Sequence, residues 1–339
     1  MAYMIKTEPS QSYANPHDPW ANGQQFEEVT TFRDNKVLIN GLTFSNDGRY
    51  MTTSDDDGFL YVYDCHTGSK ERAIHCVKCG CSDVKYLHAA NNILFAATKA
   101  NTSIRHFSLY DQKFIRFFHG HTARVTRLAI SPVDDLFLSA SEDRTVRFWD
   151  ARQQDCLGMI QTMDSVPNIA IDPDCLVVAV AVVDKFIKLY DKRYYENASS
   201  LFFNFLFGPF STFDYSMFSD REWVDMSFSN DGKFILISTS GDHIRLVDAF
   251  EGQLVHTLSG HTNDNSAPLR ATFSLCSNYI VCGGTDGKIT FWSRDTGSII
   301  SRLSTDHIDG IRQIEFNPIW KQMGSTARET KLWQTKVNA

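Results

Sequence analysis

The segment that follows His75 contains three cysteines, Cys76, Cys79 and Cys81, at a spacing at which thiolates can bind zinc. A structural zinc site usually takes four ligands, as two separated pairs. This chain offers only His88 as a loose fourth candidate. We therefore predict that these thiols are core or near-surface groups and that the chain binds no metal ion.

Two acidic motifs could also support chemistry. Asp55, Asp56 and Asp57 precede Gly58 as in a calcium loop, but the later glutamate and the alternating ligand spacing of an EF-hand are missing. His121 and Asp143 are residue types that can form an acid–base couple. The chain has no phosphate-binding GxxxxGK[ST] motif and no GxGxxG, GxSxG or HExxH motif. We therefore expect a protein that is not an enzyme and needs no cofactor.

A repeat explains why these residues occur where they do. Gly120-His121 is followed about thirty residues later by Trp149-Asp150, the signature of a WD40 repeat. Related strand endings, aromatic-Asp or similar, occur at 62–64, 107–109, 148–150, 189–191, 246–248, 291–293 and 332–334. Successive endings are separated by 45, 41, 41, 57, 45 and 41 residues. Seven endings predict an all-β fold, a seven-bladed WD40 β-propeller.

The ends of the repeat array predict the domain organisation. Residues 26–32, FEEVTTF, have strand composition, and we expect this strand to close the ring by pairing with the last blade. Residues 1–24 are polar and lack periodicity, which predicts a disordered tail before a propeller at 25–339. The long step of 57 residues contains a Phe-rich insertion at 194–207. It could be an interaction loop, a segment packed on an outer strand, or an isoform or gene-model artefact.

In the third repeat, His121, Ser139, Asp143 and Trp149 fit a buried hydrogen-bond relay. Buried polar groups must be paired, and this relay would pair them. We therefore interpret His121 and Asp143 as structural residues.

Recognition on such a fold is placed by its loops. Lys99, Arg124, Arg144 and Lys185 fall in loops of blades two to four, and could form a basic arc for an acidic or phosphorylated peptide. The alternative is that they are ordinary solvated charges. The net charge of −7 argues against direct nucleic-acid binding. We also expect no membrane span and no secretory signal, which leaves cytosol or nucleus.

Four segments resemble the WD-repeat protein 82 family: residues 44–65, HAAN at 88–91, 131–152 and 228–250. The similarity covers roughly residues 26–336. It departs from the family at the amino-terminal tail, the 194–207 segment, the Cys76–Cys81 cluster, and a second blade without Trp-Asp.

The resemblance implies a non-catalytic nuclear scaffold. The expected partners are the methyltransferase subunit of a COMPASS-type complex, which modifies lysine four of histone three, and the phosphorylated C-terminal repeat tail of RNA polymerase II. It also implies a role in transcription termination, with the cleavage and polyadenylation machinery and a nuclear protein phosphatase one complex. The alternative is a WD40 adaptor in another pathway, such as a substrate receptor of a ubiquitin ligase.

Overall fold

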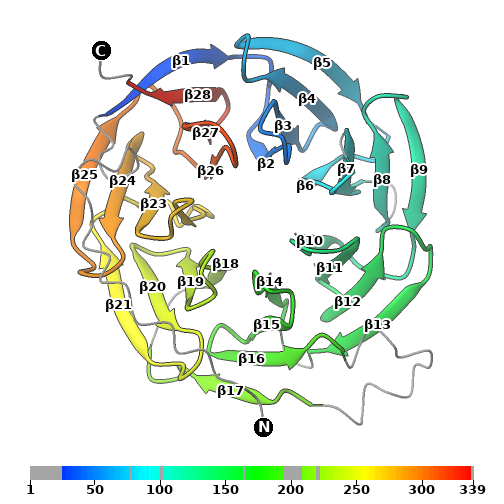
Figure 1. The fold of residues 1–339 in the computed structure, drawn as a ribbon, viewed down its shortest axis with the longest axis vertical. Coiled ribbons are helices and arrows are strands. Elements are labelled where there is room, and N and C mark those ends of the chain that lie inside the picture. Colours follow the sequence, from blue (N-terminus) through cyan, green and yellow to red (C-terminus); the bar gives the residue numbers. More distant parts are fainter. Residues whose placement is uncertain are drawn as a thin grey trace, which may run out of the picture.

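The computed structural model describes residues 25–76, 78–89, 91–99, 102–162, 165–193, 208–218 and 222–336. Twenty-eight β-strands in these residues form seven antiparallel sheets of four strands each. The sheets stand around a central axis like the blades of a propeller (Figure 1). The prediction of an all-β, seven-bladed propeller is therefore confirmed. The predicted tail at 1–24 and the Phe-rich segment at 194–207 lie outside the described residues.

Each blade contributes one strand to each of four concentric positions. The innermost strands are β2 (Ile39–Phe44), β6 (Ser82–Tyr86), β10 (Val125–Ile130), β14 (Asn168–Ile171), β18 (Trp223–Phe228), β22 (Thr272–Phe273) and β26 (Gln313–Phe316). The second strands are β3 (Tyr50–Asp55), β7 (Asn92–Ala96), β11 (Leu136–Ser141), β15 (Val177–Val182), β19 (Phe234–Thr239), β23 (Tyr279–Gly283) and β27 (Gln322–Thr326).

The outer half of each blade completes the sheet. The third strands are β4 (Phe59–Asp64), β8 (Ile104–Ser108), β12 (Thr145–Asp150), β16 (Phe186–Asp191), β20 (His243–Asp248), β24 (Lys288–Ser293) and β28 (Thr330–Thr335). The outermost strands are β5 (Ser69–His75), β9 (Lys113–Phe118), β13 (Cys156–Gln161), β17 (Ser211–Asp214), β21 (Leu254–Ser259), β25 (Ile299–Ser304) and β1 (Phe26–Phe32).

The ring is closed by strands from opposite ends of the chain. The first strand, β1, pairs antiparallel with β28, so that the seventh blade takes its outer strand from the amino-terminal part of the chain (Figure 1). The pairing runs from Phe26 opposite Thr335 to Phe32 opposite Thr330. Both phenylalanines are buried, whereas Val29 between them is exposed. This confirms the predicted closure.

The blades are held together by apolar contacts between neighbouring sheets. Each of the seven gaps between neighbouring blades contains one buried apolar cluster of the described residues. Second strands such as β15, VVAVAV, are almost wholly buried because both of their faces pack against a neighbouring blade. A single four-stranded sheet could not cover both faces, so the apolar alternation of the sequence is satisfied only when the sheets are stacked in a ring.

Local backbone features direct side chains toward the axis. The innermost strands β2, β6, β10 and β18 each have a shift of register near their first residues. Such bulges change the direction in which nearby side chains point. At the other end of the blades, two turns of sequence Asn-Asp-Gly place Gly48 and Gly232 at positive φ, 71° and 68°. No helix in the described part of the chain is long and apolar enough to cross a membrane.

Candidate functional site: the loop face and the central channel

One face of the ring carries all four residues of the predicted basic arc. Lys99 lies between β7 and β8, Arg124 between β9 and β10, Arg144 between β11 and β12, and Lys185 between β15 and β16. Neighbouring strands are antiparallel, so loops that enter an innermost strand and loops that join second to third strands emerge at the same end. The arc therefore spans blades two to four on one face, which we call the loop face. All four side chains are exposed.

Acidic and carbonyl groups lie between these cations. Arg124 Nη2 is 3.8 Å from Asp56 Oδ1, and Lys99 Nζ donates a hydrogen bond of 3.1 Å to the Asp57 carbonyl oxygen. The turns that hold Arg144 and Lys185 also contain Glu142 and Asp184. Exposed charge pairs of this kind contribute little free energy. A more strongly charged ligand, such as a phosphate, can therefore displace them.

The four predicted relay residues are joined by hydrogen bonds beneath this face. Trp149 Nε1 donates to Ser139 Oγ at 2.8 Å, and Ser139 Oγ is 2.6 Å from His121 Nε2. The carboxylate of Asp143 can only accept, so His121 Nδ1–H donates to its Oδ2 at 2.8 Å. Nε2 of the neutral imidazole then accepts from the Ser139 hydroxyl. Burial lowers the pKa of His121 and outweighs the opposing effect of Asp143. The side chains of Ser139, His121 and Asp143 therefore make these hydrogen bonds within the blade.

The seventh blade contains a second relay that the sequence analysis did not assign. His307 Nε2 is 2.8 Å from Ser325 Oγ, which accepts a hydrogen bond of 2.8 Å from Trp333 Nε1. Glu329 Oε1 lies 3.5 Å from His307 Nδ1, where Asp143 stands in blade three. The separation of 18 residues between histidine and serine, the same in both blades, was the available sequence signal.

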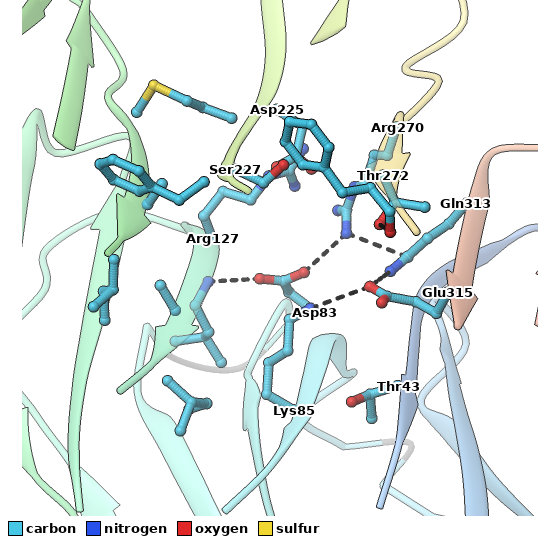
Figure 2. A pocket seen from close by; sticks show the side chains of 18 of the residues that line it. Thr43, Asp83, Lys85, Arg127, Asp225, Ser227, Arg270, Thr272, Gln313 and Glu315 are labelled. Carbon is cyan, nitrogen blue, oxygen red and sulfur yellow. Dashed lines mark hydrogen bonds and ion pairs between the residues drawn. The ribbon is translucent and has the colours of Figure 1, made fainter. Parts of the chain in front are cut away.

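A polar cavity of about 390 Å³ lies along the axis of the ring and is lined mainly by residues of the innermost strands. Three acidic and three basic side chains face it: Asp83, Asp225, Glu315, Lys85, Arg127 and Arg270. Figure 2 shows Asp83 near the centre, with Arg270 and Gln313 beyond it and Arg127 to one side. The sequence analysis did not identify these residues. For the five that lie inside innermost strands, the available signal was a charge within a short strand, whereas Arg270 lies two residues before β22.

Ion pairs cross this channel between blades that are not neighbours. Arg270 Nη1 of blade six is 3.0 Å from Asp83 Oδ1 of blade two. Arg127 Nε of blade three is 3.1 Å from Asp225 Oδ1 of blade five. Asp83 Oδ2 also accepts a hydrogen bond of 2.5 Å from the Leu128 backbone nitrogen. Burial raises the pKa of the Asp83 carboxyl, but the positive charges of Arg270, Lys85 and Arg127 outweigh it and keep the pKa below its ordinary value.

The remaining motifs are built into loops and core. Cys76, Cys79 and Cys81 are buried free thiols in the apolar cluster between blades one and two. Within the described residues, no group of three or more His, Cys, Asp or Glu side chains is placed to hold a metal ion. Asp55 Oδ1 accepts hydrogen bonds from the backbone nitrogens of Gly58 and Phe59, at 3.1 and 2.9 Å, so that it stabilises a turn.

Comparison with known proteins identifies the family. The family model "WD domain, G-beta repeat" matches residues 26–64, 112–150 and 252–293. "WD repeat-containing protein 82" of Drosophila melanogaster is 37% identical over 310 residues, which are 91% of this chain and 94% of that protein. The chain belongs to the WD-repeat protein 82 family.

Two fungal relatives of this family member are named for a complex. "COMPASS component SWD2" of Saccharomyces cerevisiae is 30% identical over 327 residues, 90% of this chain and 94% of that protein. "Set1 complex component swd2" of Schizosaccharomyces pombe is 27% identical over 259 residues, 76% of this chain and 68% of that protein.

One of the segments that carry the family resemblance joins two blades. In the HAAN segment, the imidazole of His88 makes a hydrogen bond of 2.8 Å through Nε2 to the Ser131 carbonyl oxygen, which links blade two to blade three.

Proposed function

We propose that this chain is a non-catalytic scaffold subunit of a COMPASS-type complex that methylates lysine four of histone three in the nucleus. The observation that carries the proposal is the similarity over 90% of the chain to a protein named as a COMPASS component. The fold supports it, because a rigid ring offers faces for several partners at once. The His121–Asp143 pair also supports a scaffold role, since its ring nitrogens and carboxylate are used inside the blade.

Purification of the tagged full-length chain from nuclei tests this proposal. The expected result is co-purification of a histone methyltransferase subunit and lysine-four methyltransferase activity in the eluate. The same eluate tests association with cleavage and polyadenylation factors and with protein phosphatase one. Recovery of cullin-type ubiquitin ligase subunits without a methyltransferase would favour the adaptor alternative and refute the proposal.

We further propose that the basic arc of Lys99, Arg124, Arg144 and Lys185 binds the phosphorylated C-terminal repeat tail of RNA polymerase II. The four cations are exposed on one face, across neighbouring blades, at positions that an extended peptide could follow. Lys99 donates to a backbone carbonyl and Arg124 lies near an exposed carboxylate, and both of these partners bind less strongly than a phosphate dianion would.

Charge reversal at the arc is the matching prediction. Arg124→Glu combined with Arg144→Glu should weaken binding of a phosphorylated repeat peptide by about tenfold or more, since charge-assisted hydrogen bonds are lost and repulsion is added. Lys233→Glu, an exposed change at the opposite end of blade five, is the control and should bind as the native chain does. Fluorescence anisotropy measures the affinity. Unchanged affinity in the folded double variant would refute the proposal that the basic arc binds this peptide.

A further inference from the structure

An open groove of about 470 Å³ lies on the side of the ring, between blades one and two. One wall is the end of β5, with Ala73 and Ile74; the other is blade two, with Phe107 and Phe114. Figure 1 shows the end of β5 beside the outer strands of blade two. A guanidinium nitrogen of Arg72 donates to the Leu109 carbonyl oxygen and fixes the two blades relative to each other here. The groove is therefore part of a braced surface.

The blade-two side of the groove presents an apolar surface to solvent. Phe114, which lines the groove, is 39% exposed, and the next residue of the same strand, Ile115, is 47% exposed. Phe114 packs edge-on against Phe107, with ring centroids 5.1 Å apart, so its ring is held in place by the core beneath. Exposed apolar side chains that adjoin a groove are typical of a docking surface.

The backbone at this place is also available. Both β5 and β9 are at the edges of their sheets, so their outer peptide groups have no strand beside them in the sheet order. An edge strand can accept a further strand from another protein, with main-chain hydrogen bonds supplying affinity and side-chain pockets supplying specificity. β9 carries the exposed Phe114 and Ile115, so it is the edge that a partner strand would extend.

The charge of the groove selects the partner. The guanidinium of Arg105 lies 5.3 Å from the ring centroids of both Phe114 and Phe117, which places a cation in the aromatic wall. The polar lining side chains are His75 and Gln112, and the described lining includes no carboxylate. The remaining lining group, the Cys76 thiol, is neutral because burial, with the nearby Cys79, raises its pKa to about 12. Arg105 therefore places a positive charge against the aromatic wall, and the described lining residues place no carboxylate beside it.

We propose that this groove binds an extended acidic segment of a partner protein, which adds a strand to the edge of β9 and inserts one aromatic side chain between Ile74 and Phe114. Adjacent residues of an extended strand point to opposite faces, so an acidic residue two positions from that aromatic side chain shares its face and lies toward Arg105. The site is on the side of the ring, and none of its described lining residues belongs to the basic arc, so that both surfaces can be occupied at once. It does not depend on the identity of the complex proposed above.

The test uses the full-length chain and two fluorescein-labelled octapeptides, each with one central Phe, in which all other residues are Asp in the acidic peptide and Lys in the basic peptide. The acidic peptide should bind saturably in fluorescence anisotropy, and about tenfold more tightly than the basic peptide. Ala73→Trp, an exposed change that fills the groove from β5, should weaken acidic-peptide binding by about tenfold, as does loss of an anchoring contact. Val255→Trp, on the outer strand β21, is the matched control and should leave binding unchanged.

Ile115→Asp provides a second variant in case Ala73→Trp does not fold. It should weaken binding of the acidic peptide by charge repulsion. Circular dichroism and thermal melting establish that each variant is folded. Absence of saturable binding, equal loss in the Val255→Trp control, or equal affinity for the basic peptide would overturn the proposal. So would sedimentation showing a dimer that Ala73→Trp abolishes, because the groove would then bind a second copy of this chain.

Discussion

The hydroxyl of Ser139 is shared by His121 and Trp149, while the carboxylate of Asp143 fixes the imidazole proton on Nδ1. His121→Ala would remove the imidazole bonds to Ser139 and Asp143, leave the Ser139 hydroxyl without its acceptor, and leave a space beneath the loop face. We expect the free energy of unfolding to fall by about 2 to 3 kcal/mol, the range for an unsatisfied buried polar group. Denaturant unfolding measures it, with the exposed His119→Ala as control. A native-like midpoint would contradict a structural role.

The seventh-blade relay predicts a pH dependence. Burial and the charge of Lys331 lower the pKa of His307 to about 4, whereas an unfolded histidine titrates near pH 6.5. Between these values the unfolded chain binds the proton and the folded chain does not, so acidification destabilises the fold. The contribution of His307 is fully present above pH 6.5 and is lost as the pH falls to 4, by up to about 3 kcal/mol.

A His307→Phe variant isolates this effect. It cannot take up a proton, so its stability should change less than that of the native chain between pH 6.5 and 4. The comparison is made by denaturant unfolding at several pH values within this window. Parallel curves for the two proteins would show that His307 titrates normally in the folded state.

The first relay could be predicted and the second could not, for a physical reason. In blade three the motif residues surround the relay, with Gly120 before His121 and Asp150 after Trp149. In blade seven the preceding residue is Asp306, the acid is Glu329, and a buried Lys331 enters the group. The longer glutamate compensates in part, because its Oε1 approaches His307 Nδ1 to 3.5 Å without forming a hydrogen bond. Patterns of residue type do not represent such compensation.

The closing strand β1 is attached to the ring by the buried side chains at its two ends. Phe26 stacks with Phe291 of blade six, with ring centroids 6.1 Å apart, and Phe32 stacks with Tyr63 of blade one, with ring centroids 4.0 Å apart. These two side chains attach the strand at its ends to both neighbouring blades. The middle of the strand carries Val29 and two glutamates on an exposed edge, where charges discourage further strand pairing.

We therefore expect the two ends of β1 to carry its contribution to stability. Phe26→Ala and Phe32→Ala should each lower the free energy of unfolding by about 3 kcal/mol, the usual cost of removing a buried phenylalanine. Val29→Ala, at an exposed position of the same strand, should change it by less than about 0.5 kcal/mol. Chemical denaturation compares the three variants. Equal effects at all three positions would mean that backbone pairing, and not the anchors, closes the ring.

Strand order was accessible from the sequence because the apolar alternation and the period of the endings are repeated seven times. The sequence did not show which side chains of the innermost strands point toward the axis. Asp83 lies within the register shift of β6, and Arg127 and Asp225 directly follow the shifts of β10 and β18. A bulge changes which side chains share a face of the strand, and no residue type in these strands marks the position of the bulge. The charged residues could therefore be recognised one by one in the sequence, but their grouping around the channel could not be predicted.

The ring is braced in two independent ways. Around the circumference, the seven apolar clusters and the β1–β28 pairing connect each blade to the next. Across the diameter, the Asp83–Arg270 pair connects blade two to blade six, and Arg127–Asp225 connects blade three to blade five. The cross-channel pairs place charged side chains across the axis, so a peptide would meet them before it could pass from one face to the other. Recognition is thereby directed to the faces and the rim.

Asp83→Asn tests the cross-channel brace. It keeps the size of the side chain but leaves Arg270 and Arg127 facing fewer negative charges at buried positions, so stability should fall by about 3 to 5 kcal/mol, the cost of breaking a buried ion pair. Asp309→Asn, which breaks the more exposed pair with Arg328, should cost no more than about 1 kcal/mol.

The double variant Asp83→Asn with Arg270→Gln distinguishes a direct pair from two unrelated losses. If the two side chains stabilise the ring through each other, removing both should cost less than the sum of the single changes, with a coupling energy of about 1 to 3 kcal/mol. The partner blades are far apart in the sequence and do not adjoin in the ring, so coupling through a shared apolar cluster is not available to them. Additive losses in equilibrium unfolding would therefore show that each residue acts within its own blade, and the channel would then be a lined cavity without a brace.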